Sequence, residues 1–65
     1  MDFDEKARIR LEHWLKHADD HMSEYSSFAR ELESAGKTTS AELVHEIANL
    51  AEKSKDLLEQ ALQKL

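Results

Sequence analysis

The chain has 65 residues, no cysteine, no proline, one glycine and a formal net charge of −5 at neutral pH. The lack of cysteine excludes disulfides and thiolate zinc sites. The acidic balance argues against a nucleic-acid surface, which needs basic groups to neutralise phosphate, and against an anionic membrane surface. No apolar run approaches the roughly 20 residues that span a bilayer, and the acidic first residues are unlike a signal peptide. We therefore expect a cytoplasmic protein.

The composition is rich in alanine, leucine, glutamate and lysine, which are strong helix formers. It predicts an all-α fold in a single domain over residues 1–65. A domain this small buries only about 60% of its unfolded surface. Such domains usually gain stability from disulfides, a metal or oligomerisation. Without cysteine, a metal and self-association remain.

A first helix is predicted over about residues 3–35. Asp2 or Asp4 can cap its first turn, and Asp2 has capping-box spacing with Glu5. Apolar residues then recur at steps of three and four, which is the spacing of one helix face. These residues are Ala7, Leu11, Trp14, Leu15, Ala18, Met22, Tyr25, Ala29 and Leu32. Gly36 is free to adopt the left-handed conformation that commonly closes a helix.

A second helix is predicted over about residues 40–64. Thr39 and Glu42 have the spacing of a capping box, with Thr39 as the cap. One apolar stripe follows, which consists of Leu43, Val44, Ile47, Leu50, Ala51, Leu57, Leu58, Ala61, Leu62 and Leu65, with Ser54 among them. The short polar loop between the helices makes them antiparallel, so the sequence predicts a two-helix hairpin.

Two helices alone cannot enclose a core. In the predicted hairpin an apolar flank remains partly open, formed by Phe3, Trp14, Phe28 and Leu32. We expect a second copy to cover this flank and to make a homodimeric four-helix bundle. The alternative is a metal-free interaction module, or a small subunit, that docks on a larger protein through the same flank.

Three histidines, His13, His17 and His21, follow one another at intervals of four residues on the first helix. This spacing lets two neighbouring imidazoles converge on one metal ion. His13 and His21 are about 12 Å apart along the axis, so all three cannot share an ion on a straight helix. The sequence predicts a ridge of histidines beside the apolar stripe.

Two carboxylates can complete a metal site on this ridge. His17 and His21 can act with Glu24, and His13 and His17 can act with Asp20. Two imidazoles and a carboxylate suit zinc, nickel, cobalt or iron without choosing among them. A partner chain could complete the coordination, which would couple metal binding to assembly.

Other interpretations of the ridge stay open. The histidines can be solvated side chains, or His21 can be a boundary residue paired with an acid. A cluster that titrates near neutrality can also make assembly sensitive to pH. The leading hypothesis is a non-enzymatic module that self-associates and binds a divalent metal through His17 and His21.

Two weaker patterns are interpreted as structural. Glu42 and His45 form a Glu-x-x-His pair of the kind that binds iron in ferritin-like bundles. Both are expected to point away from the core, as a cap and a surface histidine. Trp14 and Tyr25 are expected in the core rather than in a ligand site. No nucleophile with a supporting base and no phosphate-binding glycine loop is present, so the chain is predicted not to be an enzyme.

The histidine ridge belongs to a longer pattern. It comprises His13-Trp14, His17, His21, Tyr25, Phe28-Ala29, Gly36 and Ala41-Glu42. Through this pattern, residues 11–48 resemble a small, uncharacterised family of helical hairpins from anaerobic microbes, with the signature His-Trp-x-x-His-x-x-x-His. The resemblance implies a hairpin architecture and a histidine signature, and it carries no activity.

Overall fold

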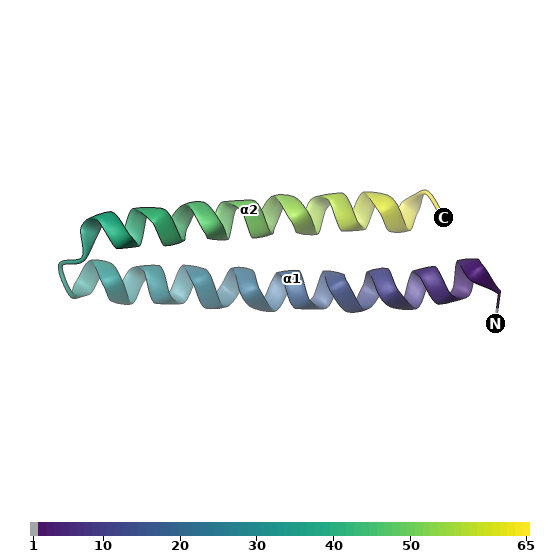
Figure 1. The fold of residues 1–65 in the computed structure, drawn as a ribbon, viewed down its shortest axis with the longest axis horizontal. Coiled ribbons are helices and arrows are strands. Elements are labelled where there is room, and N and C mark those ends of the chain that lie inside the picture. Colours follow the sequence, from purple (N-terminus) through teal and green to yellow (C-terminus); the bar gives the residue numbers. More distant parts are fainter. Residues whose placement is uncertain (1) are drawn as a thin grey trace.

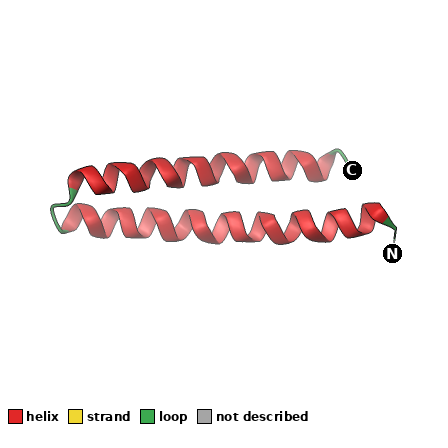
Figure 2. Cartoon of the chain, viewed as in Figure 1, coloured by secondary structure: helices red, strands yellow, loops and turns green. Residues whose placement is uncertain are grey.

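The computed structural model describes residues 2–65, which form two long helices. Helix α1 (Phe3–Ser34) and helix α2 (Thr38–Gln63) lie antiparallel and side by side (Figure 1). In this part of the chain, only the connection and the two ends are not helical (Figure 2). The predicted all-α hairpin is confirmed, with bounds close to those expected. Neither helix in residues 2–65 has the length and apolarity to cross a membrane.

The two ends of α1 are closed by the residues that the sequence indicates. The Asp2 carboxylate accepts a hydrogen bond from the Glu5 amide at 2.9 Å. At the other end, Gly36 has a φ of +78°, a conformation that favours glycine. The Lys37 amide donates to the Leu32 carbonyl at 2.8 Å and the Gly36 amide donates to Glu33 at 3.0 Å. These two bonds are those of a Schellman motif, which satisfies carbonyls that the helix end leaves free.

The predicted capping box of α2 is wrong. The helix begins at Thr38, its cap residue is Lys37, and no side chain bonds to its free amides. The physical reason lies in the turn. Lys37 closes the end of α1 through its amide, and its carbonyl already accepts from the Ala41 amide at 2.9 Å. The connection is therefore too short for Thr39 to stand outside the helix as a cap.

The seam between α1 and α2 follows a seven-residue repeat. Its positions alternate in steps of three and four, as in antiparallel coiled coils, and we label them a and d. On α1 they are Leu11, Leu15, Ala18, Met22, Tyr25, Ala29 and Leu32, and on α2 they are Ala41, Val44, Ala48, Ala51, Lys55, Leu58 and Leu62. All are at least partly buried. The buried residues are three alanines, Ala29, Ala41 and Ala48, so small side chains hold the helices together where the packing is tightest.

The structure divides the single predicted stripe of α2 into two. One half forms the seam, and the other points outward at positions c and g of the repeat. The outward residues are Leu43, Ile47, Leu50, Ser54, Leu57 and Ala61, and all of them are exposed. Positions c and g lie about 110° around the helix from the seam, at 100° per residue. Helix α2 thus carries a second apolar stripe that α1 does not cover.

Helix α1 has a matching outward side. Phe3 at c and Trp14 and Phe28 at g are exposed, as expected for an open flank. Two assignments need correction. Trp14, which was expected both on the open flank and in the core, is 51% exposed and lies on the flank alone, because α1 turns Leu11 and Leu15 toward α2. Leu32, expected on the open flank, lies partly buried in the seam at position d.

The alanine seam leads to a prediction on stability. Ala29 is 0% exposed and faces α2, so Ala29→Leu should force the helices apart and lower the free energy of unfolding by about 1–3 kcal/mol. The same change at exposed Ser27, on the far side of α1, should alter it by less than about 0.5 kcal/mol. Thermal unfolding at one fixed chain concentration measures both. Equal stability of the two variants would contradict the close-packed seam.

Candidate functional site

The histidine ridge is present in the structure as a row of rings along α1. The rings of His13 and His17 have centroids 4.4 Å apart and are tilted by 48°. Those of His17 and His21 are 6.0 Å apart and edge-on. The His21 ring then stacks on Tyr25 at 5.8 Å. Successive imidazoles are therefore close enough to act in pairs, as the spacing predicts.

The candidate carboxylates differ in their relation to this row. Glu24 Oε2 lies 3.5 Å from Nδ1 of His21, so the structure brings these two groups together. No ion pair within 4 Å joins Asp20 to a histidine in the described part of the chain. Within residues 2–65 of one chain, no group of three or more possible metal ligands is placed around one ion.

The rotation of α1 gives the three histidines different surroundings. His13 occupies position f, which points away from the seam, whereas His17 is at c and His21 is at g. His17 and His21 therefore share the outward side of α1 with Trp14 and Phe28. The hypothesis drawn from the sequence already favours His17 and His21 over His13, and the structure likewise separates His13 from the other two.

Contacts between the helices define a charged flank that sequence analysis missed. His45 Nε2 lies 2.6 Å from Oε1 of Glu33, and Lys55 Nζ donates to Oδ1 of Asp19 at 3.1 Å. His45 was expected to point away from the core, and it instead lies at the edge of the seam and reaches across to α1. The signal was available, because Asp19, Glu33 and His45 all occupy position e, and e residues face one another in antiparallel pairs.

The charged flank fixes the position of the opposite one. Because Asp19, Glu33 and His45 place position e of both helices on one side of the seam, position g of both helices lies on the other side. Residues 14, 21 and 28 of α1 thus lie beside residues 61, 54 and 47 of α2. Together with the neighbouring c positions they form what we call the outer face. Its members are Phe3, Ala7, Arg10, Trp14, His17, His21, Glu24, Phe28 and Glu31 on α1 and Leu43, Ile47, Leu50, Ser54, Leu57 and Ala61 on α2.

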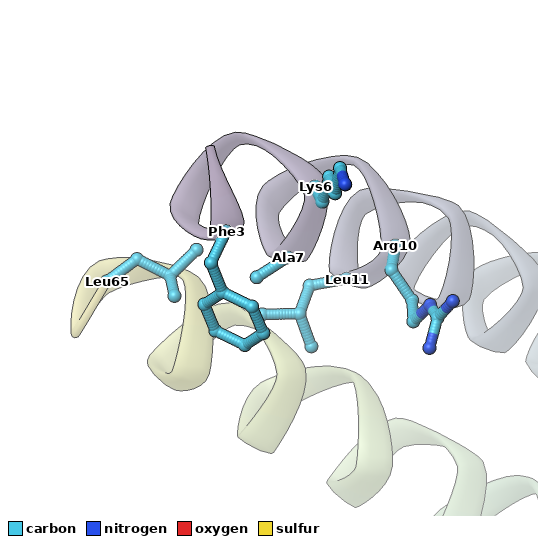
Figure 3. A pocket seen from close by; sticks show the side chains of 6 residues that line it. All are labelled: Phe3, Lys6, Ala7, Arg10, Leu11 and Leu65. Carbon is cyan, nitrogen blue, oxygen red and sulfur yellow. The ribbon is translucent and has the colours of Figure 1, made fainter. Parts of the chain in front are cut away.

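A pocket lies at the open end of the hairpin, where the termini meet. Phe3, Ala7, Leu11 and Leu65 line it with apolar atoms, and Lys6 and Arg10 lie beside it. In the view of Figure 3, the Phe3 ring lies next to Leu11 and Ala7. Phe3 and Ala7 belong to the outer face, so the pocket extends that face to the end of the molecule.

The fold and this surface define a class of protein: a helical hairpin with one charged flank and one apolar outer face. A family model described as a Domain of unknown function (DUF8180) matches residues 7–65. The chain belongs to this family. Comparisons with curated proteins and with solved structures gave no match. The match is consistent with the resemblance to an uncharacterised family that the sequence suggested, whereas the histidine signature and the anaerobic source stay predictions.

The charged flank leads to a prediction on pH. The hydrogen bond and charge of Asp19 raise the pKa of Lys55 above its ordinary 10.5. A raised folded-state pKa means that the stabilisation is complete below the unfolded-state pKa and is lost as pH rises through the folded-state pKa. Asp19→Asn should therefore lower the melting temperature slightly at about pH 8, and this difference from the original chain should be lost at alkaline pH, as the pH rises through the raised pKa of Lys55.

The neighbouring acid supplies the control for this measurement. Asp20 is exposed and lies at position f, away from the seam. Asp20→Asn should leave the melting temperature nearly unchanged at both pH values. A loss that persists at alkaline pH in Asp19→Asn would show that the Asp19–Lys55 pair is not its cause.

Proposed function

We propose that this chain is a non-enzymatic self-association module, in which the hairpin pairs with a second copy through the outer face to form a homodimeric four-helix bundle. The observation that supports it most strongly is the second heptad stripe of α2. Leu43, Ile47 and Leu50 follow one another at steps of four and three, as seam residues do, and Leu57 comes seven residues after Leu50, with Ser54 between them. No part of the described chain covers these four apolar residues. Regular spacing of this kind is how a helix packs along another helix.

The distribution of polarity supports the same proposal. On α2, the described residues at positions b, e and f are all polar: Glu42, His45, Glu46, Asn49, Glu52, Lys53, Asp56, Glu59, Gln60 and Gln63. On α1, Ile9 at position b is the single apolar exception at these positions. Exposed large apolar side chains otherwise gather on the outer face, apart from Leu65 at the end of the chain. A helix that needed only one partner would carry one such stripe.

The angle between the two stripes suits a bundle of four helices. In a four-helix bundle each helix packs against two neighbours, at directions roughly 90° apart around its axis. The seam and the outer face are about 110° apart, at 100° per residue. Each helix of the hairpin can therefore contact its partner in the chain and one helix of the second copy at the same time.

The exposed area is what a dimer of this size needs to bury. The chain exposes 5063 Å², whereas a compact monomer of 7.5 kDa exposes about 4,200 Å². The excess, roughly 800 Å², equals the area that one partner buries in a standard stable interface. The hairpin is also thin, with Cα extents of 51 × 15 × 11 Å, so its large side chains have no interior to enter.

A larger protein is the alternative partner, and a divalent metal at the histidine ridge is a second candidate function. A second copy is favoured over a larger protein as the partner, because its own outer face has the same spacing of apolar residues and the same exposed area. The metal is favoured by His17 and His21, which stand one turn apart on the outer face, where a second copy would meet them.

Two isoleucines give a matched test of the dimer. Ile47 on the outer face is 44% exposed and Ile9 outside it is 54% exposed. Ile47→Glu should raise the dimer dissociation constant by about a hundredfold or more, because it buries a charge in the interface. Ile9→Glu should leave it unchanged. Sedimentation equilibrium over a range of chain concentrations measures both, with circular dichroism to confirm that each variant stays helical.

Two results would contradict the proposal. A chain that stays monomeric at about 100 μM, both with a chelator and with added zinc, has no self-association strong enough to serve as a function. Equal weakening by Ile9→Glu and Ile47→Glu would show that the copies meet elsewhere. If the chain is monomeric, the alternative that a larger protein covers the outer face would stand in place of the dimer.

A further inference from the structure

The outer face also indicates how two copies are oriented. A closed pair with antiparallel neighbouring helices can form in two ways. Either both turns lie at the same end, and α1 packs on α2 of the second copy, or the turn of each copy lies at the open end of the other. In the second arrangement α1 packs on α1 and α2 packs on α2. The polarity of the outer face distinguishes the two.

With both turns at one end, the faces do not match. The Asp19–Lys55 bond fixes which residues of α1 and α2 share a level along the hairpin. At that register Leu50 lies at the level of Glu24, and Leu57 lies at the level of His17. This arrangement would therefore place the leucines of α2 against the charged and polar c positions of α1 in the other copy. Desolvating those groups against leucine is costly.

With the turns at opposite ends, the apolar stripe of α2 meets the same stripe of the second copy, and the polar segment of α1 meets the same polar segment. The apolar stripe of α2, from Leu43 to Leu57, packs on its own copy. On α1, the segment from His17 to Glu24 lies near the middle of the outer face, so it meets the same segment of the second copy around the two-fold axis. Arg10 and Glu31, which flank this segment at c positions, come near each other across the interface and have opposite charges. This arrangement is the one that the outer face favours.

We propose that the resulting dimer binds one divalent transition metal ion, such as Zn²⁺, between its two α1 helices, with His17 and His21 of both copies as ligands. This proposal rests on the dimer proposed above. Four imidazoles give the tetrahedral set that zinc and cobalt prefer. A single chain assembles no such set within residues 2–65, and two copies joined at this segment double the number of imidazoles.

Glu24 has a positioning role in this site. Its carboxylate Oε2 lies 3.5 Å from Nδ1 of His21, so a small side-chain movement would let it accept a hydrogen bond from Nδ1–H and leave Nε2 for a metal. One Glu24 from each copy also places negative charge beside the ion, which four neutral imidazoles do not neutralise. His13 is not part of the site, because position f turns it away from the outer face.

The first measurement counts metal per chain in protein prepared without a histidine tag. Cobalt titration should produce the visible absorption of tetrahedral cobalt and saturate at one ion per two chains. Sedimentation equilibrium should show a dimer that zinc tightens at least about tenfold relative to chelator. Saturation at one ion per chain would overturn the shared site.

Variants then locate the ligands. His21→Ala should abolish the cobalt spectrum, and His21→Gln repeats the test with a side chain closer in size. Glu24→Gln should weaken binding by about 10–100-fold and leave the tetrahedral spectrum in place. His13→Ala is the matched control and should bind as the original chain does. If His13→Ala loses binding and His21→Ala keeps it, the site lies on the solvent side of one chain, and the proposal is wrong.

The monomeric variant separates a shared site from a site within one chain. Ile47→Glu lies on α2 and leaves His17, His21 and Glu24 intact, yet it should lose metal binding together with the dimer. Ile9→Glu should keep both. Tight binding by monomeric Ile47→Glu would overturn the shared site. A dimer of the original chain that ignores zinc, cobalt and nickel would overturn the metal proposal and leave self-association standing, whereas a monomer under all conditions would remove both.

Discussion

The close approach of α1 and α2 along their alanines determines most of the other features of the molecule. Ala29, Ala41 and Ala48 fill the tightest part of the seam, where a leucine has no room at that helix separation. Beside these alanines, the larger apolar residues Leu43, Ile47 and Leu50 of α2 lie on the outer face, whereas Leu58 and Leu62 enter the seam farther from the turn. Because the only buried seam residues among residues 2–65 are alanines, the single hairpin gains limited stability from its seam. The close packing of the helices along these alanines thus accounts for both the thin shape of the molecule and its second apolar surface.

The two flanks of the seam differ in polarity. On one flank, the Asp19–Lys55 and Glu33–His45 contacts use polar groups in the half-exposed positions beside the seam. Exposed pairs of this kind add little stability, and their value lies in register and orientation. On the other flank, apolar residues take the corresponding positions. A second copy that approached the charged flank would have to desolvate those pairs, so the polarity of the flanks favours one side for assembly.

Much of this fold can be predicted from the sequence, because caps and turns are local. Asp2 and Gly36 each act through bonds within a few residues, and both were identified from spacing alone. The division of the α2 stripe could not be predicted in the same way. Apolar residues there occupy two neighbouring stripes, and which of them face α1 depends on the size of the side chains opposite. Trp14 was misplaced for this reason, and Thr39 because the length of the turn depends on both helices.

The rotation of α1 about its axis also determines which histidines of the ridge lie on the outer face. From spacing, His13–His17 and His17–His21 are equal candidates, and the rings of the first pair are in fact closer, at 4.4 Å against 6.0 Å. Ring separation is adjustable, since exposed side chains change rotamer freely, whereas position on the helix is not.

His17 and His21 interrupt an apolar face at its middle, where Ser54 of α2 lies beside His21. Polar residues within an apolar interface cost stability unless they are satisfied, and they fix register when they are. A shared metal ion would satisfy them, whereas an ion held by His13 and His17 would leave His21 with only the Glu24 carboxylate, 3.5 Å away, as a polar partner in the interface. The shorter ring distance favours the His13–His17 pair, and the position of His17 and His21 within the outer face favours the His17–His21 pair. Position on the helix is the stronger of the two arguments.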